Sequence, residues 1–115
     1  MVKEDEVKRF LDDFKVKLKT WGIIYRDDRG KNTQTLLDLE IRPVDRTMVL
    51  KSLKTEDYSE GPIDDVYYGG SPLWVFGKEI KQNEVYIKIT LGNENNKTIC
   101  ISFHIAEYSM KYPFK

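Results

Sequence analysis

The clearest pattern in this chain is an alternation of apolar and polar residues in its last third. The alternation covers residues 84–91, stops at the polar segment 92–97, and resumes over residues 98–104. A period of two predicts half-buried β-strands, and a short polar turn between two such strands predicts an antiparallel hairpin. We therefore expect one face of this hairpin to lie in the core and the other face to carry polar side chains.

The alternation also restricts how the two strands pair. A slip of one residue would turn the apolar set of one strand toward solvent, so odd-numbered residues must pair with odd-numbered residues. One register that meets this condition pairs Leu91 with Ile99 and places Tyr86 opposite His104, the single histidine of the chain. The remaining members of the predicted polar face are Lys88, Thr90, Cys100 and Ser102, with Lys88 opposite Ser102.

The first half of the chain is patterned as helices. Apolar residues at three- and four-residue steps predict an amphipathic helix over residues 3–21 that ends at Gly22. Further helices are expected from a cap at Asn32 or Thr33 to Leu39, and over residues 44–53. The residues expected on their buried sides are Val7, Phe10, Leu11, Phe14, Leu18, Trp21, Leu36, Leu37, Leu39, Val44, Met48, Val49 and Leu53.

The remaining segments complete a predicted α+β fold. Residues 22–26 are expected to form a short edge strand, and residues 73–80 a strand with Trp74 and Phe76 in the core. Residues 54–72 show no clear period, and so long a loop is usually functional or contains a short element. The apolar tail after residue 105 is expected to pack on the body. Helices before strands predict one domain, residues 1–115, with helices on one face of an antiparallel sheet of three or more strands.

Composition limits the classes of partner and cofactor. The 115 residues have zero formal net charge and a pI near 6.6, which argues mildly against a nucleic-acid partner unless basic residues cluster locally. No apolar run reaches the length of about 18 residues that a membrane span requires, and no signal-peptide pattern is present. One cysteine and one histidine supply no ordinary zinc ligand set. We therefore expect a cytoplasmic protein without a metal, a cofactor or a membrane partner.

The predicted polar face carries groups that can cleave RNA. Metal-independent cleavage needs a base for the 2′-hydroxyl, an acid for the leaving 5′-oxygen, and cations for the charged phosphorane. His104 is a candidate acid or base, and Tyr86 can donate a hydrogen bond or stack on a base. The candidate phosphate-binding cations are Lys88, Arg26, Arg29 and Lys31. The same residues also fit a solvated sheet face and a charged turn in which the cations pair with Asp27 and Asp28.

Parts of the chain resemble a known family. The segments Leu-Trp at 73–74, Val-Tyr-Ile-Lys-Ile-Thr at 85–90 and Ile-Cys-Ile-Ser-Phe at 99–103 are similar to the end of MqsR-type toxins of bacterial type II toxin–antitoxin systems. Residues 53–59 resemble another segment of that family, and residues 32–39 resemble it more faintly. The resemblance covers roughly residues 32–104 and identifies the chain as a divergent member of the family.

The resemblance implies a RelE-like fold and an mRNA interferase, a metal-independent endoribonuclease that a cognate antitoxin protein neutralises. The strand tyrosine of the family matches Tyr86. His104 stands where the family has a catalytic lysine, and Ser59 and Val75 occupy positions where it has a lysine and a glutamine.

Two functional interpretations follow from the sequence. The first is a toxin that cleaves mRNA by 2′-hydroxyl attack, with His104, Tyr86 and Lys88 as catalytic residues. The alternative is a non-catalytic protein-interaction module of the same fold. Its partner surface would combine the acidic segment 54–65 with the aromatic tail residues Tyr108, Tyr112 and Phe114.

Overall fold

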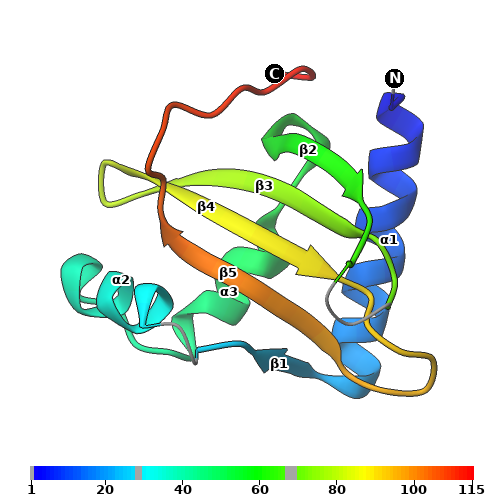
Figure 1. The fold of residues 1–115 in the computed structure, drawn as a ribbon, viewed down its shortest axis with the longest axis horizontal. Helices are drawn as coiled ribbons and strands as arrows, with labels where there is room; N and C mark the ends of the chain where they lie inside the picture. Colours follow the sequence, from blue (N-terminus) through cyan, green and yellow to red (C-terminus); the bar gives the residue numbers. More distant parts are fainter. Residues whose placement is uncertain (1, 28–29, 67–69) are drawn as a thin grey trace.

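Helices and one mixed sheet form an α+β fold in the computed structural model, which describes residues 2–27, 30–66 and 70–115 (Figure 1). The helices are α1 (Glu4–Trp21), α2 (Lys31–Leu39) and α3 (Asp45–Ser52), with a 3₁₀ turn η1 (Thr55–Asp57). The strands are β1 (Ile23–Tyr25), β2 (Tyr58–Ile63), β3 (Leu73–Ile80), β4 (Asn83–Thr90) and β5 (Thr98–Ile105). This confirms the predicted fold class and is compatible with a RelE-like arrangement.

The sheet has the strand order β1-β5-β4-β3-β2. Strands β2 to β5 form an antiparallel meander, whereas β1 joins the edge of β5 in parallel. The sheet is therefore mixed rather than purely antiparallel. The segment without a sequence period contains η1 and β2, so it holds a short element of its own rather than a single loop.

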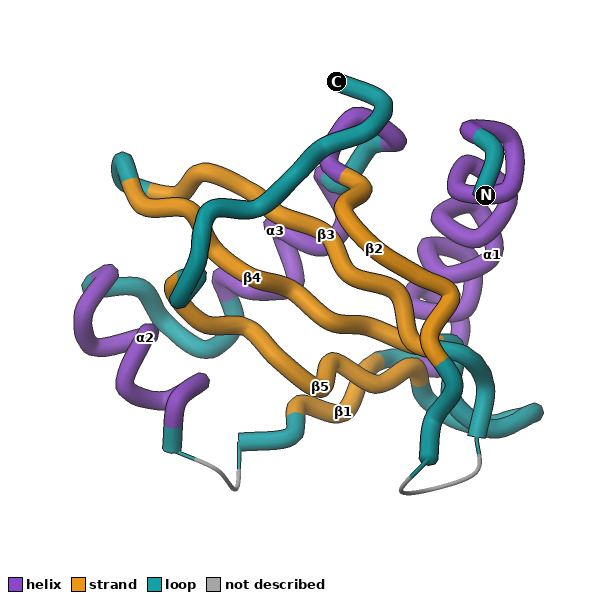
Figure 2. Tube along the Cα trace, turned by 45° about the horizontal axis from the view of Figure 1, so that its top comes forward, coloured by secondary structure: helices purple, strands orange, loops and turns teal. Residues whose placement is uncertain are grey.

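Helices α1 and α3 lie behind the sheet in Figure 1, and the C-terminal segment passes in front of β4 and β3 in Figure 2. The apolar stripe of α1 packs into the core as predicted, and the ring of Phe10 stacks on Trp74 with centroids 4.8 Å apart. Trp74 and Phe76 are buried. The face of the sheet opposite α1 is thus left to carry the polar residues of the hairpin.

Four helix residues expected in the core are exposed: Trp21, Leu37, Val44 and Met48. Helices α2 and α3 are short, and their contact with the sheet uses polar as well as apolar side chains. On α3, Arg46 and Leu50 are buried. On α2, the buried set includes Asn32 and Thr35, and the helix is capped by Gly30 with a φ of 81° rather than by Asn32 or Thr33. Apolar periodicity could not find these polar contacts.

The β4–β5 hairpin has the predicted register from the Val85–Ile105 pair to the Lys88–Ser102 pair. Tyr86 lies opposite His104 and Lys88 lies opposite Ser102, as predicted. Beyond this point Ile89 pairs with Cys100 and Thr90 pairs with Ile99, so the predicted pairing of Leu91 with Ile99 is wrong.

The cause of the change in register is a β-bulge at Ile101. Ile101 is an extra residue on β5 between the Lys88–Ser102 and Ile89–Cys100 pairs. An extra residue reverses the alternation on one side of the bulge. Cys100 therefore points into the core, where it is fully buried, and its predicted place on the polar face is wrong.

Candidate active site

Beyond the end of β1, side chains of α2 form hydrogen bonds with the backbone of β5. The last contact of the β1 segment is from the Arg26 N–H to the Cys100 carbonyl, at 2.9 Å. Beyond it, the Asn32 side chain accepts a hydrogen bond from the Phe103 N–H at 2.9 Å and donates one to the Ile101 carbonyl at 3.3 Å. The Thr35 hydroxyl accepts from the Ile105 N–H at 3.1 Å. Helix α2 is thereby fixed against the strand that carries His104.

Asn32 also ties the start of the β1–α2 connection to β5. Its side-chain nitrogen donates to the Arg26 carbonyl at 2.8 Å, and the residue is buried. One amide group thus holds the backbone of Arg26 close to the bulge at Ile101. This placement of α2 and of the connection creates one wall of a pocket.

The pocket lies between α2, the outer face of β4 and β5, and the start of the C-terminal segment. Its volume is about 330 Å³. The residues that line it are Arg26, Lys31, Asn32, Tyr86, Lys88, Ile101, Ser102, His104, Glu107 and Tyr108. The bulge turns Ile101 outward, so that it supplies an apolar part of the lining. Three cations and one carboxylate among these residues make the lining locally basic although the net charge of the chain is zero.

Tyr86 and His104 form a stacked pair in this pocket. Their ring centroids are 5.1 Å apart with an angle of 13° between the planes, and Lys88 Nζ lies 5.8 Å from the centroid of the Tyr86 ring. Burial, followed by the charge of Glu60, raises the pKa of Tyr86. The phenol therefore keeps its proton at neutral pH and acts as a hydrogen-bond donor or a stacking surface.

The orientation of the His104 ring is fixed by its own strand. Its Nδ1 lies 2.9 Å from the Ile105 carbonyl oxygen. Because a carbonyl only accepts, Nδ1 carries the hydrogen of this bond. The tautomer then leaves Nε2 as the nitrogen that can take up or release a proton.

Lys31 and Glu107 meet at the rim of the pocket. Lys31 Nζ donates to Glu107 Oε1 at 2.5 Å, and both side chains are more than half exposed. The hydrogen bond from Lys31, reinforced by its charge, lowers the pKa of Glu107. An anionic ligand that contacts Lys31 must therefore compete with this carboxylate.

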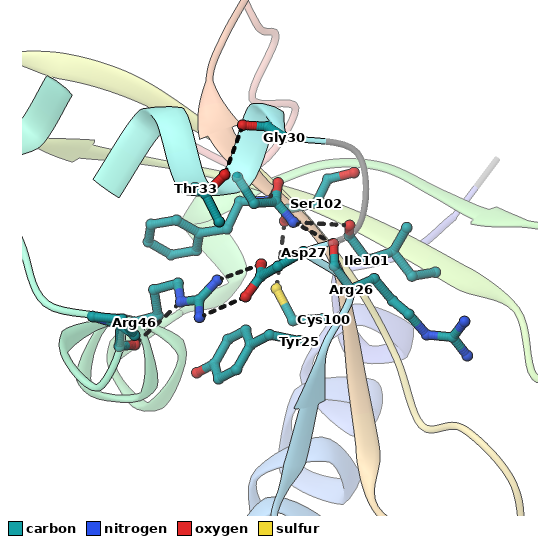
Figure 3. A network of polar contacts seen from close by, with 12 residues as sticks. Tyr25, Arg26, Asp27, Gly30, Thr33, Arg46, Cys100, Ile101 and Ser102 are labelled. Carbon is teal, nitrogen blue, oxygen red and sulfur yellow. Dashed lines mark hydrogen bonds and ion pairs between the residues drawn. The ribbon is translucent and has the colours of Figure 1, made fainter. Parts of the chain in front are cut away.

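The connection that carries Arg26 is held by an ion pair between Asp27 and the buried side chain of Arg46. Arg46 donates to both carboxylate oxygens of Asp27, at 2.8 and 3.1 Å, and its guanidinium lies 3.8 Å from the centroid of the Tyr25 ring. Figure 3 shows Asp27 facing Arg46 while the side chain of Arg26 points away from this cluster. The hydrogen bond from Arg46 is the main cause of the lowered pKa of Asp27.

The described members of the predicted site all line the same pocket: Arg26, Lys31, Tyr86, Lys88 and His104. Arg29 lies outside the residues that the structure describes. Asp27 pairs with Arg46, a cation outside its own turn, and Asp28 lies outside the described residues. Cys100 does not take part, because its burial raises the pKa of its thiol to about 12.

The sequence did not place four of the pocket residues at this site: Asn32, Ile101, Glu107 and Tyr108, the last of which was assigned to the alternative partner surface. Asn32 was considered only as a helix cap, because a buried amide bonded to a strand has no periodic signature. Glu107 follows His104 by three residues just beyond β5. The pattern of the strand ends before it, and only the direction of the chain after Ile105 brings it to the pocket.

The C-terminal tail covers the rest of the outer face. Tyr112 packs against Gly77, where a Cβ would collide with the phenol, and its hydroxyl donates to Glu84 at 2.7 Å. Phe114 lies 5.5 Å from Tyr58 between ring centroids. Two of the aromatic residues assigned to a partner surface are thus engaged within the chain, and Tyr108 is exposed at the pocket.

Comparisons with known proteins give no match: no family model, no curated protein and no solved structure is similar to this chain. None of the helices in the described part of the chain has the length and apolar character needed to cross a bilayer. Within the same residues, no group of three or more His, Cys, Asp or Glu side chains is placed to hold a metal ion.

Proposed function

We propose that this chain is a metal-independent endoribonuclease that cleaves mRNA by attack of the ribose 2′-hydroxyl, as the toxin of a toxin–antitoxin system. The observation that carries the proposal is the convergence of the predicted residues. Side chains chosen from separate parts of the sequence, Arg26 and Lys31 on one side and Tyr86, Lys88 and His104 on the other, line one pocket. A solvated face does not require this convergence.

The pocket offers the groups that the reaction requires. His104 transfers a proton through Nε2, a role that contributes about 10²- to 10⁴-fold to a rate. Arg26, Lys31 and Lys88 stabilise the negative charge that develops on the phosphorane. Tyr86, protonated at neutral pH, donates a hydrogen bond or stacks on an unpaired base. Cleavage then leaves a 2′,3′-cyclic phosphate and a 5′-hydroxyl.

The biological role and the protein partner rest on the resemblance to MqsR-type toxins. That resemblance supports mRNA as the substrate and a cognate antitoxin protein as the partner. A depression beside the pocket supports a ligand longer than one nucleotide. It shares Tyr86 and Tyr108 with the pocket, and its volume is about 390 Å³.

Induced expression in a bacterial host tests the proposal. We expect the wild-type chain to arrest growth, His104→Ala to abolish the arrest, and Tyr86→Phe to weaken it. Lys8→Ala serves as the control, since Lys8 is an exposed residue of α1 that is absent from the pocket. Thermal melts of the purified variants separate lost chemistry from lost folding. A harmless wild-type chain, or a folded His104→Ala variant that is equally toxic, would contradict the proposal.

A further inference from the structure

The proposed reaction requires two proton transfers at different atoms. In an in-line displacement the attacking 2′-oxygen and the leaving 5′-oxygen lie on opposite sides of phosphorus. A single imidazole cannot lie beside both oxygens in the same transition state. If His104 serves one oxygen, a second group in the pocket must serve the other.

We propose that Glu107 is the general base that removes the 2′-hydroxyl proton, with His104 as the general acid at the 5′-oxygen. This inference rests on the proposed function and names a catalytic residue that the sequence did not indicate. Of the described residues that line the pocket, Glu107 is the one that carries a carboxylate. Lysine and arginine side chains are cations near neutral pH and cannot accept this proton.

The chain holds this carboxylate at the pocket in two ways. Glu107 lies two residues after the end of β5 and three residues after His104, so the two side chains come from one short stretch of backbone. Lys31 then fixes the carboxylate from the opposite wall, through the ion pair to Oε1. The side chain remains about half exposed, so a ribose hydroxyl can reach it.

The ion pair with Lys31 also makes the proton affinity of Glu107 depend on whether Lys31 binds a phosphate. In the free protein Lys31 keeps Glu107 ionised but weakens it as a base, because the same hydrogen bond lowers its pKa. A phosphate that takes Lys31 as its own partner removes this bond. The carboxylate then gains proton affinity at the moment when the 2′-hydroxyl is in place.

Two protons move in the proposed step. The Glu107 carboxylate takes the 2′-hydroxyl proton, the 2′-oxygen forms a bond to phosphorus, and the bond from phosphorus to the 5′-oxygen breaks. The protonated His104 gives its Nε2 proton to the 5′-oxygen. The protein is left with a neutral carboxylic acid and a neutral imidazole, and proton exchange with water restores both groups.

The pH dependence of single-turnover cleavage tests this assignment. The probe is a fluorescein-labelled single-stranded RNA that contains all four nucleotides, incubated with an excess of the purified full-length chain. The wild type should give a bell-shaped profile, since the base must be ionised and the acid protonated. Glu107→Gln should lower the rate by about 10²-fold or more and abolish the rise on the acidic side. Glu107→Asp should retain that rise at a reduced rate.

Binding of the all-2′-deoxy form of the same oligonucleotide, followed by fluorescence anisotropy, separates chemistry from affinity. Glu107→Gln should bind this uncleavable probe at least as tightly as the wild type, because a competing charge is removed from Lys31. The matched control is Glu94→Gln in the β4–β5 turn, at a glutamate that does not line the pocket. Its rate and profile should match those of the wild type.

Three results would overturn the assignment. If Glu107→Gln cleaves within about threefold of the wild type and keeps the acidic limb, Glu107 is not the base, while the nuclease proposal stands. If Glu107→Gln no longer binds the uncleavable probe, its role is structural and the assignment is wrong. If the wild type does not cleave RNA at all, this inference and the proposed function fail together.

Discussion

Two ion pairs flank the same connection between β1 and α2, and they differ sharply in their surroundings. Asp27, which follows β1, pairs with Arg46; the Arg46 side chain is 3% exposed and the Asp27 side chain is 31% exposed. Lys31, at the start of α2, pairs with Glu107, and these side chains are 61% and 52% exposed. The first pair has two hydrogen bonds and an aromatic neighbour, whereas the second has a single hydrogen bond at a pocket rim.

The difference in exposure indicates a structural role for one ion pair and a ligand-binding role for the other. An ion pair with two bonds to a buried guanidinium is costly to break, because removing the carboxylate leaves the buried charge without compensation. An exposed pair adds little to stability and is screened by salt. We therefore assign Arg46–Asp27 to holding the connection in place, and Lys31–Glu107 to an exchange with the phosphate of a ligand.

The largest expected effect on stability comes from breaking the Arg46–Asp27 pair. Asp27→Ala should lower the free energy of unfolding by about 3 kcal/mol, because it leaves the Arg46 guanidinium, which is 3% exposed, without its carboxylate. Urea denaturation followed by circular dichroism measures this change. The double variant Arg46→Ala with Asp27→Ala should recover part of the loss. A loss equal to that of an exposed variant such as Lys8→Ala would show that the pair is not a support.

Asn32→Ala should have the next largest effect, a loss of about 2 kcal/mol in the free energy of unfolding. The Phe103 N–H, whose hydrogen bond to Asn32 is buried, would lose its acceptor. Asn32→Asp offers a sharper variant, because it keeps the acceptor for Phe103 and loses the donors to Arg26 and Ile101. Hydrogen exchange at the Phe103 amide locates the effect. An unchanged exchange rate in Asn32→Ala would contradict this role.

Tyr112→Phe should have a smaller effect, about 1 kcal/mol, because it removes one hydrogen bond to Glu84 and retains the ring over Gly77. Gly77→Ala should be more harmful, since the added methyl group occupies the position of the phenol. Thermal melts of both variants compare the two. Equal stability of Gly77→Ala and the wild type would show that the tail is not packed on the sheet.

The Arg46–Asp27 pair should also make stability depend on pH in the acidic range. Arg46 lowers the pKa of Asp27 in the folded state. A lowered folded-state pKa contributes stability that is present above the unfolded pKa of the aspartate and is lost as the pH falls through the folded value. Asp27→Asn should therefore flatten the acidic part of the curve of unfolding free energy against pH. An identical slope in Asp27→Asn and the wild type would contradict the contribution.

The exposed pair should have the smallest effect on stability and a clear effect on ligand binding. Lys31→Ala should leave the denaturation midpoint close to that of the wild type, because the pair is open to solvent. The same variant should bind single-stranded RNA more weakly, with a salt dependence that is less steep by roughly one counterion. Anisotropy titrations over a range of salt concentrations measure both quantities. An unchanged affinity for RNA with an unchanged salt dependence would show that Lys31 does not bind phosphate.

The parts of the molecule that follow a simple period were predictable from the sequence. The helix α1, the strands β3 to β5, and the pairing of Tyr86 with His104 depend on apolar residues that must face one core. This regularity was sufficient to identify the pocket residues Tyr86, Lys88, Ser102 and His104, since residues of one parity share one sheet face.

The rest depends on contacts that leave no period in the sequence. The bulge at Ile101 reverses the alternation locally, and it sends Cys100 inward although the sequence pattern places it outside. The parallel addition of β1 to β5 is fixed by tertiary contacts, including hydrogen bonds from the Thr98 N–H and hydroxyl to the Gly22 carbonyl. Glu107 enters the pocket through the path of the chain after β5, which only the fold determines.

The measurement that tests the central claim most directly is cleavage of an RNA whose single preferred site carries a 2′-deoxyribose. The purified chain is first given the all-ribose RNA in the presence of EDTA, and the cleaved bond is mapped. We predict a 2′,3′-cyclic phosphate at that bond with the wild type, no cleavage there when its 2′-hydroxyl is absent, and none with His104→Ala. Cleavage of the deoxy-substituted bond at the wild-type rate, or no cleavage of the all-ribose RNA, would contradict the account.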